Sequence, residues 1–121
     1  MTRFNVNAVS SIQRMGFEVT SEEKRKNPIF SVRYSTNKTI KLFSKLYNNS
    51  ENKSEKFAAI MTCHEGDQRC PLIQGSEKRI SLFYEDPKIF DDKLIQKEKY
   101  DALSLKIASE LFYVFREVSK K

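Results

Sequence analysis

The chain has 121 residues and a formal net charge of +6. This length predicts a single domain over residues 1–121 with a modest core. The longest apolar-rich run, around Phe57–Met61, is far shorter than the ~20 residues of a membrane span, and the polar N-terminus has no apolar signal-peptide core. Residues 1–58 hold 11 Lys or Arg against 5 Asp or Glu, but these charges are scattered without an arginine cluster, which argues against nucleic acid as a partner.

The N-terminal segment predicts a short helix. Ala8, Val9, Ile12 and Met15 recur at helical spacing. Gly16 follows at the position of a left-handed C-cap, and either Asn5 or Asn7 is able to cap the start; these additional residues support the same helix. We expect a strand to begin directly afterwards, near Phe17-Glu18-Val19.

Two alternating runs then predict a β-hairpin. In Pro28–Ser35 the apolar residues Phe30, Val32 and Tyr34 alternate with polar ones, which is typical of a strand with one solvated face. The run Thr39–Tyr47 alternates again after a short turn. The lysines of this hairpin are expected on its outer face.

The second half of the chain predicts buried strands and a long helix. Phe57–Met61 is apolar without alternation, as in a parallel strand buried on both faces, and Ile80–Tyr84 is a second candidate that ends before Pro87. From an N-cap at Asp91 or Asp92 a helix is expected to about Ser119, packed on one face of the sheet. Its predicted buried stripe comprises Tyr100, Leu103, Ile107, Leu111, Val114 or Phe115, and Val118. Strands alternating with helices imply an α/β fold.

Both cysteines and the only histidine lie in one stretch, IMTCHEGDQRCP, residues 60–71. Cys63, His64 and Cys70 are three soft ligands, but zinc usually takes four, in closely spaced pairs from separate turns. No fourth Cys or His exists in the sequence. We therefore predict no metal site and no cofactor.

The same stretch matches the pattern Cys, five residues, Arg, the phosphate-binding signature of cysteine phosphatases. Such a loop binds an oxyanion through converging backbone N–H groups and the arginine. Glu65 and Asp67 lie inside it and would repel phosphate, and Cys70 follows Arg69 where the signature has a hydroxyl residue. We interpret the match as coincidence.

A redox pair is the third interpretation. Cys63 ends a predicted buried strand, where open α/β sheets place their chemistry, and six residues separate it from Cys70. If those residues rearrange, the sulfurs are able to meet, whereas a helical turn or two would hold them apart. The alternative is a core thiol at Cys63 and an unrelated surface thiol at Cys70.

A family resemblance favours the redox interpretation. The run FAAIMTCHEGDQRCP, the later KRISLFYEDP and the C-terminal LFYVFREV resemble the low-molecular-weight protein tyrosine phosphatase superfamily, over about residues 5–119. Within it, the thioredoxin-coupled arsenate reductases and related bacterial phosphatase-like proteins are the most similar. The resemblance implies an incomplete phosphotyrosine-phosphatase-I-like parallel sheet with flanking helices and an inserted β-hairpin.

The resemblance also implies roles for three residues. Cys63 corresponds to the second relay cysteine, which attacks a cysteine–arsenic adduct, and Cys70 to the third, which leaves a disulfide for thioredoxin to reduce. Asp86, in Glu85-Asp86-Pro87, corresponds to the general acid; a plain turn residue before Pro87 is the alternative.

The family's first Cys-x5-Arg loop and first strand have no counterpart in these residues. The resemblance therefore implies the C-terminal portion of an arsenate-reductase-like or phosphatase-like protein that is inactive as this chain. It also implies an unpaired apolar edge on Phe57–Met61, through which we expect a homodimer or a rearranged strand. A stand-alone thiol-redox module and a non-catalytic interaction domain are the alternatives.

Overall fold

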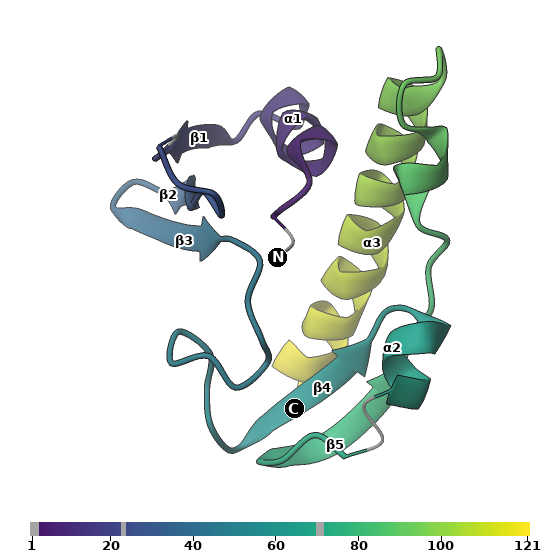
Figure 1. Cartoon of the computed structure of the whole chain (residues 1–121). Coiled ribbons are helices and arrows are strands. Elements are labelled where there is room, and N and C mark those ends of the chain that lie inside the picture. The colour runs from purple at the N-terminus through teal and green to yellow at the C-terminus, as the bar shows by residue number, and fades with distance from the viewer. Residues whose placement is uncertain (1–2, 23, 70–71) are drawn as a thin grey trace. The chain divides into compact units, whose positions relative to one another are not determined.

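The computed structural model describes residues 3–22, 24–69 and 72–121 (Figure 1). The chain forms two compact units, one of Met1–Ser44 with Pro87–Lys121 and the other of Lys45–Asp86. The first contains a three-stranded antiparallel sheet and helices, and the second contains two parallel strands and a short helix. The fold is therefore mixed α/β, which confirms the predicted class at this level.

Helix α1, Val6–Arg14, forms where the apolar spacing predicts it. The Asn5 side chain caps its start by accepting a hydrogen bond of 2.8 Å from the Asn7 backbone N–H. Gly16 has a φ of +101°, a left-handed conformation that disfavours other residues, and it turns the chain into the first strand. The two local signals at the ends of this helix are both confirmed.

The first sheet has the order β1-β2-β3, from strands Glu18–Ser21, Phe30–Ser35 and Lys38–Leu42. Phe30 and Val32 of β2 are buried, as the alternation predicts, whereas Tyr34 is 57% exposed and was wrongly expected on the buried face. The Phe30 ring contacts that of Phe4, with the centroids 6.4 Å apart. This half of β2 therefore contributes to the core of the first unit, together with Val9 of α1 and Tyr100 near the C-terminal end of the chain.

Strand β3 ends at Leu42, five residues before the predicted end at Tyr47. The Asn27 side chain donates to the Ser44 carbonyl at 2.7 Å and accepts from the Ser44 N–H at 3.2 Å. Because these bonds occupy the Ser44 backbone groups, the chain leaves the ladder with β2 at this point.

The C-terminal helix α3 runs from Gln96 to Ser119, so its predicted start at Asp91 or Asp92 is wrong. A 3₁₀ helix, η1, occupies Pro87–Phe90, and Asp92 has a φ of +63°, which interrupts the helical path. The Gln96 side chain accepts the Asp92 N–H at 2.7 Å, and Asp91 accepts the Tyr100 hydroxyl at 2.7 Å. Burial, with that hydrogen bond, raises the pKa of Tyr100 to about 12.

Only the first turns of α3 are well covered. Within the first unit the helix packs against α1 and η1. Of the predicted stripe, Tyr100 is buried, and the side chains at 103, 107 and 111 are half-buried. Val114, Phe115 and Val118 are exposed by 44%, 66% and 59%.

A polar network joins α1 to α3. The fully buried Ser11 hydroxyl donates to Asp101 at 2.6 Å and lies 3.1 Å from the Ser104 hydroxyl. Arg14 pairs with both Asp101 oxygens, at 2.8–3.1 Å. The hydrogen bonds from Arg14 and then Ser11 lower the pKa of Asp101, since they favour its ionised form.

The second unit is built on strands β4, Phe57–Met61, and β5, Ser76–Ser81, which pair in parallel with Ile60 opposite Ile80. The parallel pairing is confirmed, but burial on both faces is wrong: Ala59 is the one buried residue of β4, and β5 has none. Among the described residues β5 is the one strand that pairs with β4.

Strand β5 begins at Ser76, four residues before the predicted start. Gly75, with a φ of +89°, fixes this register because a Cβ there would lie 2.0 Å from the Ser54 carbonyl oxygen. The Lys56 N–H donates to the Gly75 carbonyl at 3.1 Å. Beyond Ser81, the Leu82 and Tyr84 N–H groups still bond to the carbonyls of residues 61 and 62.

The α1–α3 network predicts a pH-dependent stability. Because the pKa of Asp101 is lower in the folded chain than in the unfolded chain, its ionised side chain stabilises the fold above the ordinary pKa. This stabilisation is lost as the pH falls through the pKa that Asp101 has in the folded chain. We expect Asp101→Asn to lower the Tm at pH 7, and the difference from the wild type to shrink below about pH 4.

Thermal unfolding followed by circular dichroism from pH 7 to pH 2.5 measures this difference. Glu18→Gln is the matched control because it removes a carboxylate from an exposed pair with Arg33, and we expect little change. A Tm difference for Asp101→Asn that is constant over this range would contradict the prediction.

Candidate functional site

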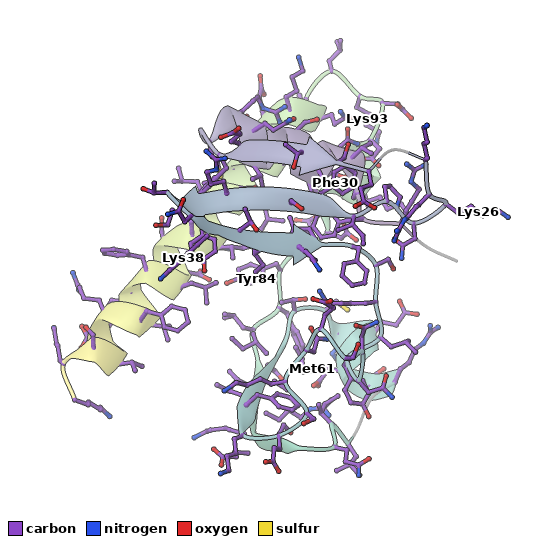
Figure 2. The ribbon with its side chains drawn as sticks, turned by 90° about the vertical axis from the view of Figure 1, so that its left-hand side faces the viewer. Lys26, Phe30, Lys38, Met61, Tyr84 and Lys93 are labelled. Atoms are coloured by element: carbon purple, nitrogen blue, oxygen red, sulfur yellow. The ribbon has the colours of Figure 1, made fainter. Side chains whose placement is uncertain are left out.

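Two of the predicted site residues lie at one end of the β4–β5 sheet. Because the strands are parallel, the segments that follow them leave at the same edge. Cys63 comes two residues after β4, and Asp86 follows β5 after the segment in which Tyr84 N–H bonds to the Thr62 carbonyl at 3.0 Å. Figure 2 labels Met61, at the end of β4, and Tyr84. Chemistry in open α/β sheets is typically found at this carboxyl end.

Cys63 lies directly before helix α2, His64–Arg69, and is a free thiol. Its Sγ accepts the Gly66 N–H at 3.3 Å, and its carbonyl accepts the Asp67 N–H at 3.1 Å. A Cβ on residue 66 would lie 2.9 Å from this sulfur, so glycine permits the close approach. Cys63 is exposed, which contradicts the alternative of a core thiol at this position.

Helix α2 is fixed to β5 by Arg79. Arg79 Nε and Nη2 donate to Asp67 Oδ1 at 3.0 and 2.8 Å, and Nη2 also donates to the Asp67 main-chain carbonyl. Ser81 Oγ donates weakly to the same carboxylate oxygen at 3.4 Å. The side chains of Asp67 and Arg79 are each 25% exposed, less than those of the Arg14–Asp101 pair at 35% and 41%. We call Asp67, Arg79 and Ser81 the α2 clasp.

The other ion pair of α2 is exposed. Arg69 pairs with Glu65 one turn earlier at 2.6 Å, with side-chain exposures of 77% and 69%. In a phosphate cradle Arg69 would close over an anion at Cys63, but here it lies at the last position of the helix. The N–H groups of residues 66 and 67 are directed to the Cys63 sulfur and carbonyl. This geometry favours the interpretation of the Cys-x5-Arg match as coincidence.

The remaining predicted residues are placed as follows. Cys70 lies outside the described residues. The His64 ring contacts Phe83 edge-on, with centroids 5.5 Å apart. Within residues 3–22, 24–69 and 72–121 no cluster of three His, Cys, Asp or Glu side chains is arranged to hold a metal ion. Over the same residues, no helix combines the length and apolar character of a membrane span.

A groove of about 520 Å³ runs beside β4. Its lining residues are Lys45, Leu46, Tyr47, Asn52, Lys53, Phe57, Ala58, Ala59, Ile60, Met61, Gly66 and Ile73. Most of the lining surface is apolar, and two lysines lie among the lining residues. The groove therefore follows the whole length of β4 and reaches Gly66 of α2.

Three lysines of the first unit lie apart from one another. Lys26, Lys38 and Lys93 come from three separate segments and lie far apart in Figure 2, where Lys26 points away from the sheet. This distribution agrees with the scattered charge of the sequence.

Sequence reasoning missed Arg79 and Gly66. Arg79 directly precedes the predicted strand Ile80–Tyr84, in a charged run that shows no strand alternation. The sequence did contain a signal for Gly66. It lies three residues after Cys63, where the backbone N–H at the start of a helix donates to the side chain of the capping residue.

No family model, curated protein or solved structure matches this chain in the comparisons made.

The geometry of α2 predicts that phosphate does not bind at Cys63. Glu65 and Asp67 place negative charge in its first turn, and Arg69 is paired with Glu65. We expect millimolar phosphate or vanadate to leave the rate of Cys63 alkylation by iodoacetamide unchanged, as followed by peptide mass mapping. Protection of Cys63 that disappears in Arg69→Ala would show that an anion cradle forms.

Proposed function

We propose that this chain is a C-terminal portion of a protein of the low-molecular-weight phosphatase superfamily, most similar to the thioredoxin-coupled arsenate reductases. In this proposal Cys63 and Cys70 form a dithiol–disulfide pair. The observation that carries it is the position of Cys63: an exposed thiol at the carboxyl end of β4, directly before the helix that separates it from Cys70. The Cys spacing, Pro71 and the Glu85-Asp86-Pro87 turn follow in the order of those reductases.

In this proposal, residues 64–69 of α2 unwind when the Cys63–Cys70 disulfide forms. The helix spans six residues, or about 9 Å, and the Cα atoms of a disulfide lie within about 7 Å. Oxidation removes two protons and two electrons from the two thiols and forms one S–S bond; an azo compound such as diamide takes them up and becomes a hydrazine. The reduced chain with α2 folded and the oxidised chain with residues 64–69 unwound are therefore two distinct states.

The first cysteine of the relay is not among these 121 residues, since Cys63–Arg69 is the one Cys-x5-Arg match. Without that nucleophile Cys63 has no arsenic adduct to attack, and Asp86 has no leaving group to protonate. We therefore expect this chain by itself neither to reduce arsenate nor to hydrolyse phosphate esters. Asp86 is the residue to which the family role of general acid is assigned.

The redox proposal predicts an intramolecular disulfide. Stoichiometric diamide is expected to produce a Cys63–Cys70 bond, detected by peptide mapping without reduction, with loss of amide protection over residues 64–69. Thioredoxin is expected to reduce this bond faster than the same concentration of a small thiol.

Cys63→Ser and Cys70→Ser are the matched controls, because each leaves one thiol and permits only intermolecular bonds. If the wild type gives only intermolecular Cys70–Cys70 dimers, the two cysteines are unrelated thiols and the redox proposal is wrong.

A second candidate function is association through the β4 edge. Its strand carries no charged residue and no proline, the usual protections of an exposed edge, and the apolar groove lies along it. The occupant we propose is β4 of a second copy, which would pair edge to edge with it. This candidate makes the chain a non-catalytic interaction module.

Ile60 and Ile80 provide a matched test of this association. They are register partners with 42% and 41% exposure, but only Ile60 lines the groove. We expect the wild type to sediment as a dimer, Ile60→Lys as a monomer, and Ile80→Lys as the wild type does. A monomeric wild type at 100 μM, or equal effects of the two variants, would contradict association through this edge.

A further inference from the structure

A second cavity of the second unit lies beside the loop that leads from β3 to β4. Its volume is about 500 Å³, within the range of small-molecule sites. Nine described residues line it, and all of them belong to this unit. Four are carboxamides, two are serines, two are aromatic and one is a lysine. The lining is therefore mostly neutral and polar, in contrast to the apolar groove beside β4.

The loop that forms one wall of this cavity is held by its own amide side chains. Asn52 Nδ2 donates to the Tyr47 carbonyl at 3.0 Å and to the Leu46 carbonyl at 3.4 Å. Asn49 Oδ1 accepts the Glu51 N–H at 2.9 Å. These bonds use the NH₂ group of one amide and the oxygen of the other. The recorded contacts therefore leave the Asn52 oxygen as an acceptor and the Asn49 NH₂ group as a donor, on a loop of fixed shape.

Gln74 lines the same cavity from the segment that precedes β5. Gly75, which follows it, lies so close to the loop that a Cβ would be 2.0 Å from the Ser54 carbonyl oxygen and 3.3 Å from the Phe57 ring. The Lys56 N–H also donates to the Gly75 carbonyl at 3.1 Å. The close approach at Gly75 therefore fixes the Gln74 side of the cavity against the loop side.

These groups match the chemistry of a sugar. Carboxamides and hydroxyls supply both donors and acceptors without a charge, as sugar hydroxyls do, and they come from both sides of the cavity. The two aromatic rings supply apolar surface for the C–H face of a sugar ring, because the face of an aromatic ring is electronegative. A nucleobase presents its polar atoms along its edges only, and a polyanion requires more than one cation.

We propose that this cavity binds a neutral hexopyranose. Tyr47, which is 44% exposed, and the half-buried Phe57 provide the apolar contact, while the amides of the loop and Gln74 bind the hydroxyls. The inference goes beyond the redox function and is independent of it, since neither Cys63 nor the α2 clasp lines the cavity.

Titration of the full chain with single sugars, followed by its ¹H–¹⁵N NMR spectrum, tests this inference. The probes are glucose, mannose, galactose and N-acetylglucosamine, each to about 50 mM, and adenosine is the control for a nucleobase. We expect at least one sugar to shift the amides of residues 47–57 and 74 and to saturate in the millimolar range, and adenosine to leave them unchanged.

Three variants assign the binding to this cavity. Asn48→Ala and Gln74→Ala remove lining amides for which no hydrogen bond is recorded in the described part of the chain, and Tyr47→Leu removes a ring. We expect each to weaken sugar binding roughly threefold to tenfold. Asn37→Ala is the matched control, because it removes an exposed amide from the turn between β2 and β3, and we expect wild-type binding. A thermal melt of each protein establishes that it is folded.

Two results would overturn the inference. The first is that no sugar of the panel shifts these amides, or that adenosine alone does. The second is that a sugar binds but that Asn48→Ala, Gln74→Ala and Tyr47→Leu all bind it as the wild type does, because its site then lies outside this cavity.

Discussion

The half-buried ion pair between Asp67 and Arg79 is the contact on which the candidate site depends. It joins the helix that follows Cys63 to the strand that leads to Asp86, so both predicted residues are held relative to one sheet edge. An arginine in this position binds the carboxylate and a main-chain carbonyl that the helix leaves without an internal partner. The geometry at Cys63, including the Gly66 N–H on its sulfur, therefore depends on a residue 16 positions later in the chain.

The first unit also contains a carboxylate that accepts hydrogen bonds from an arginine. There Arg14 and the fully buried Ser11 of α1 converge on Asp101 of α3. This network fixes the first turns of α3, and no comparable contact is recorded for the apolar residues near its end, which are exposed in the described chain. In both units a carboxylate that accepts an arginine holds two segments far apart in sequence. In the second unit the element that it holds is short enough to unwind.

Part of the candidate site could be predicted from local patterns. An apolar run followed by Cys63 indicated a strand that ends at a thiol, and a second predicted strand ended before Glu85-Asp86-Pro87. The parallel pairing of β4 and β5 brings the segments that follow them to a common edge. The exposure of Cys63 was not predicted, because it depends on the tertiary surroundings of the residues that follow β4. The role of Arg79 was not predicted because the register of β5 brings it to Asp67, and no local sequence pattern encodes that register.

The sequence by itself determined α1, with its Asn5 cap and Gly16 turn, and the buried positions of β2, because helical caps and strand alternation act within a few residues. Only the tertiary structure decided where β3, β5 and α3 begin or end. Asn27 binds the backbone at Ser44, Gly75 lies against the Ser54 carbonyl, and Asp91 accepts the Tyr100 hydroxyl instead of capping a helix. Hydrophobic periodicity is a property of neighbouring residues, whereas each of these boundaries is set by a hydrogen bond or a steric limit between residues 9 to 21 positions apart.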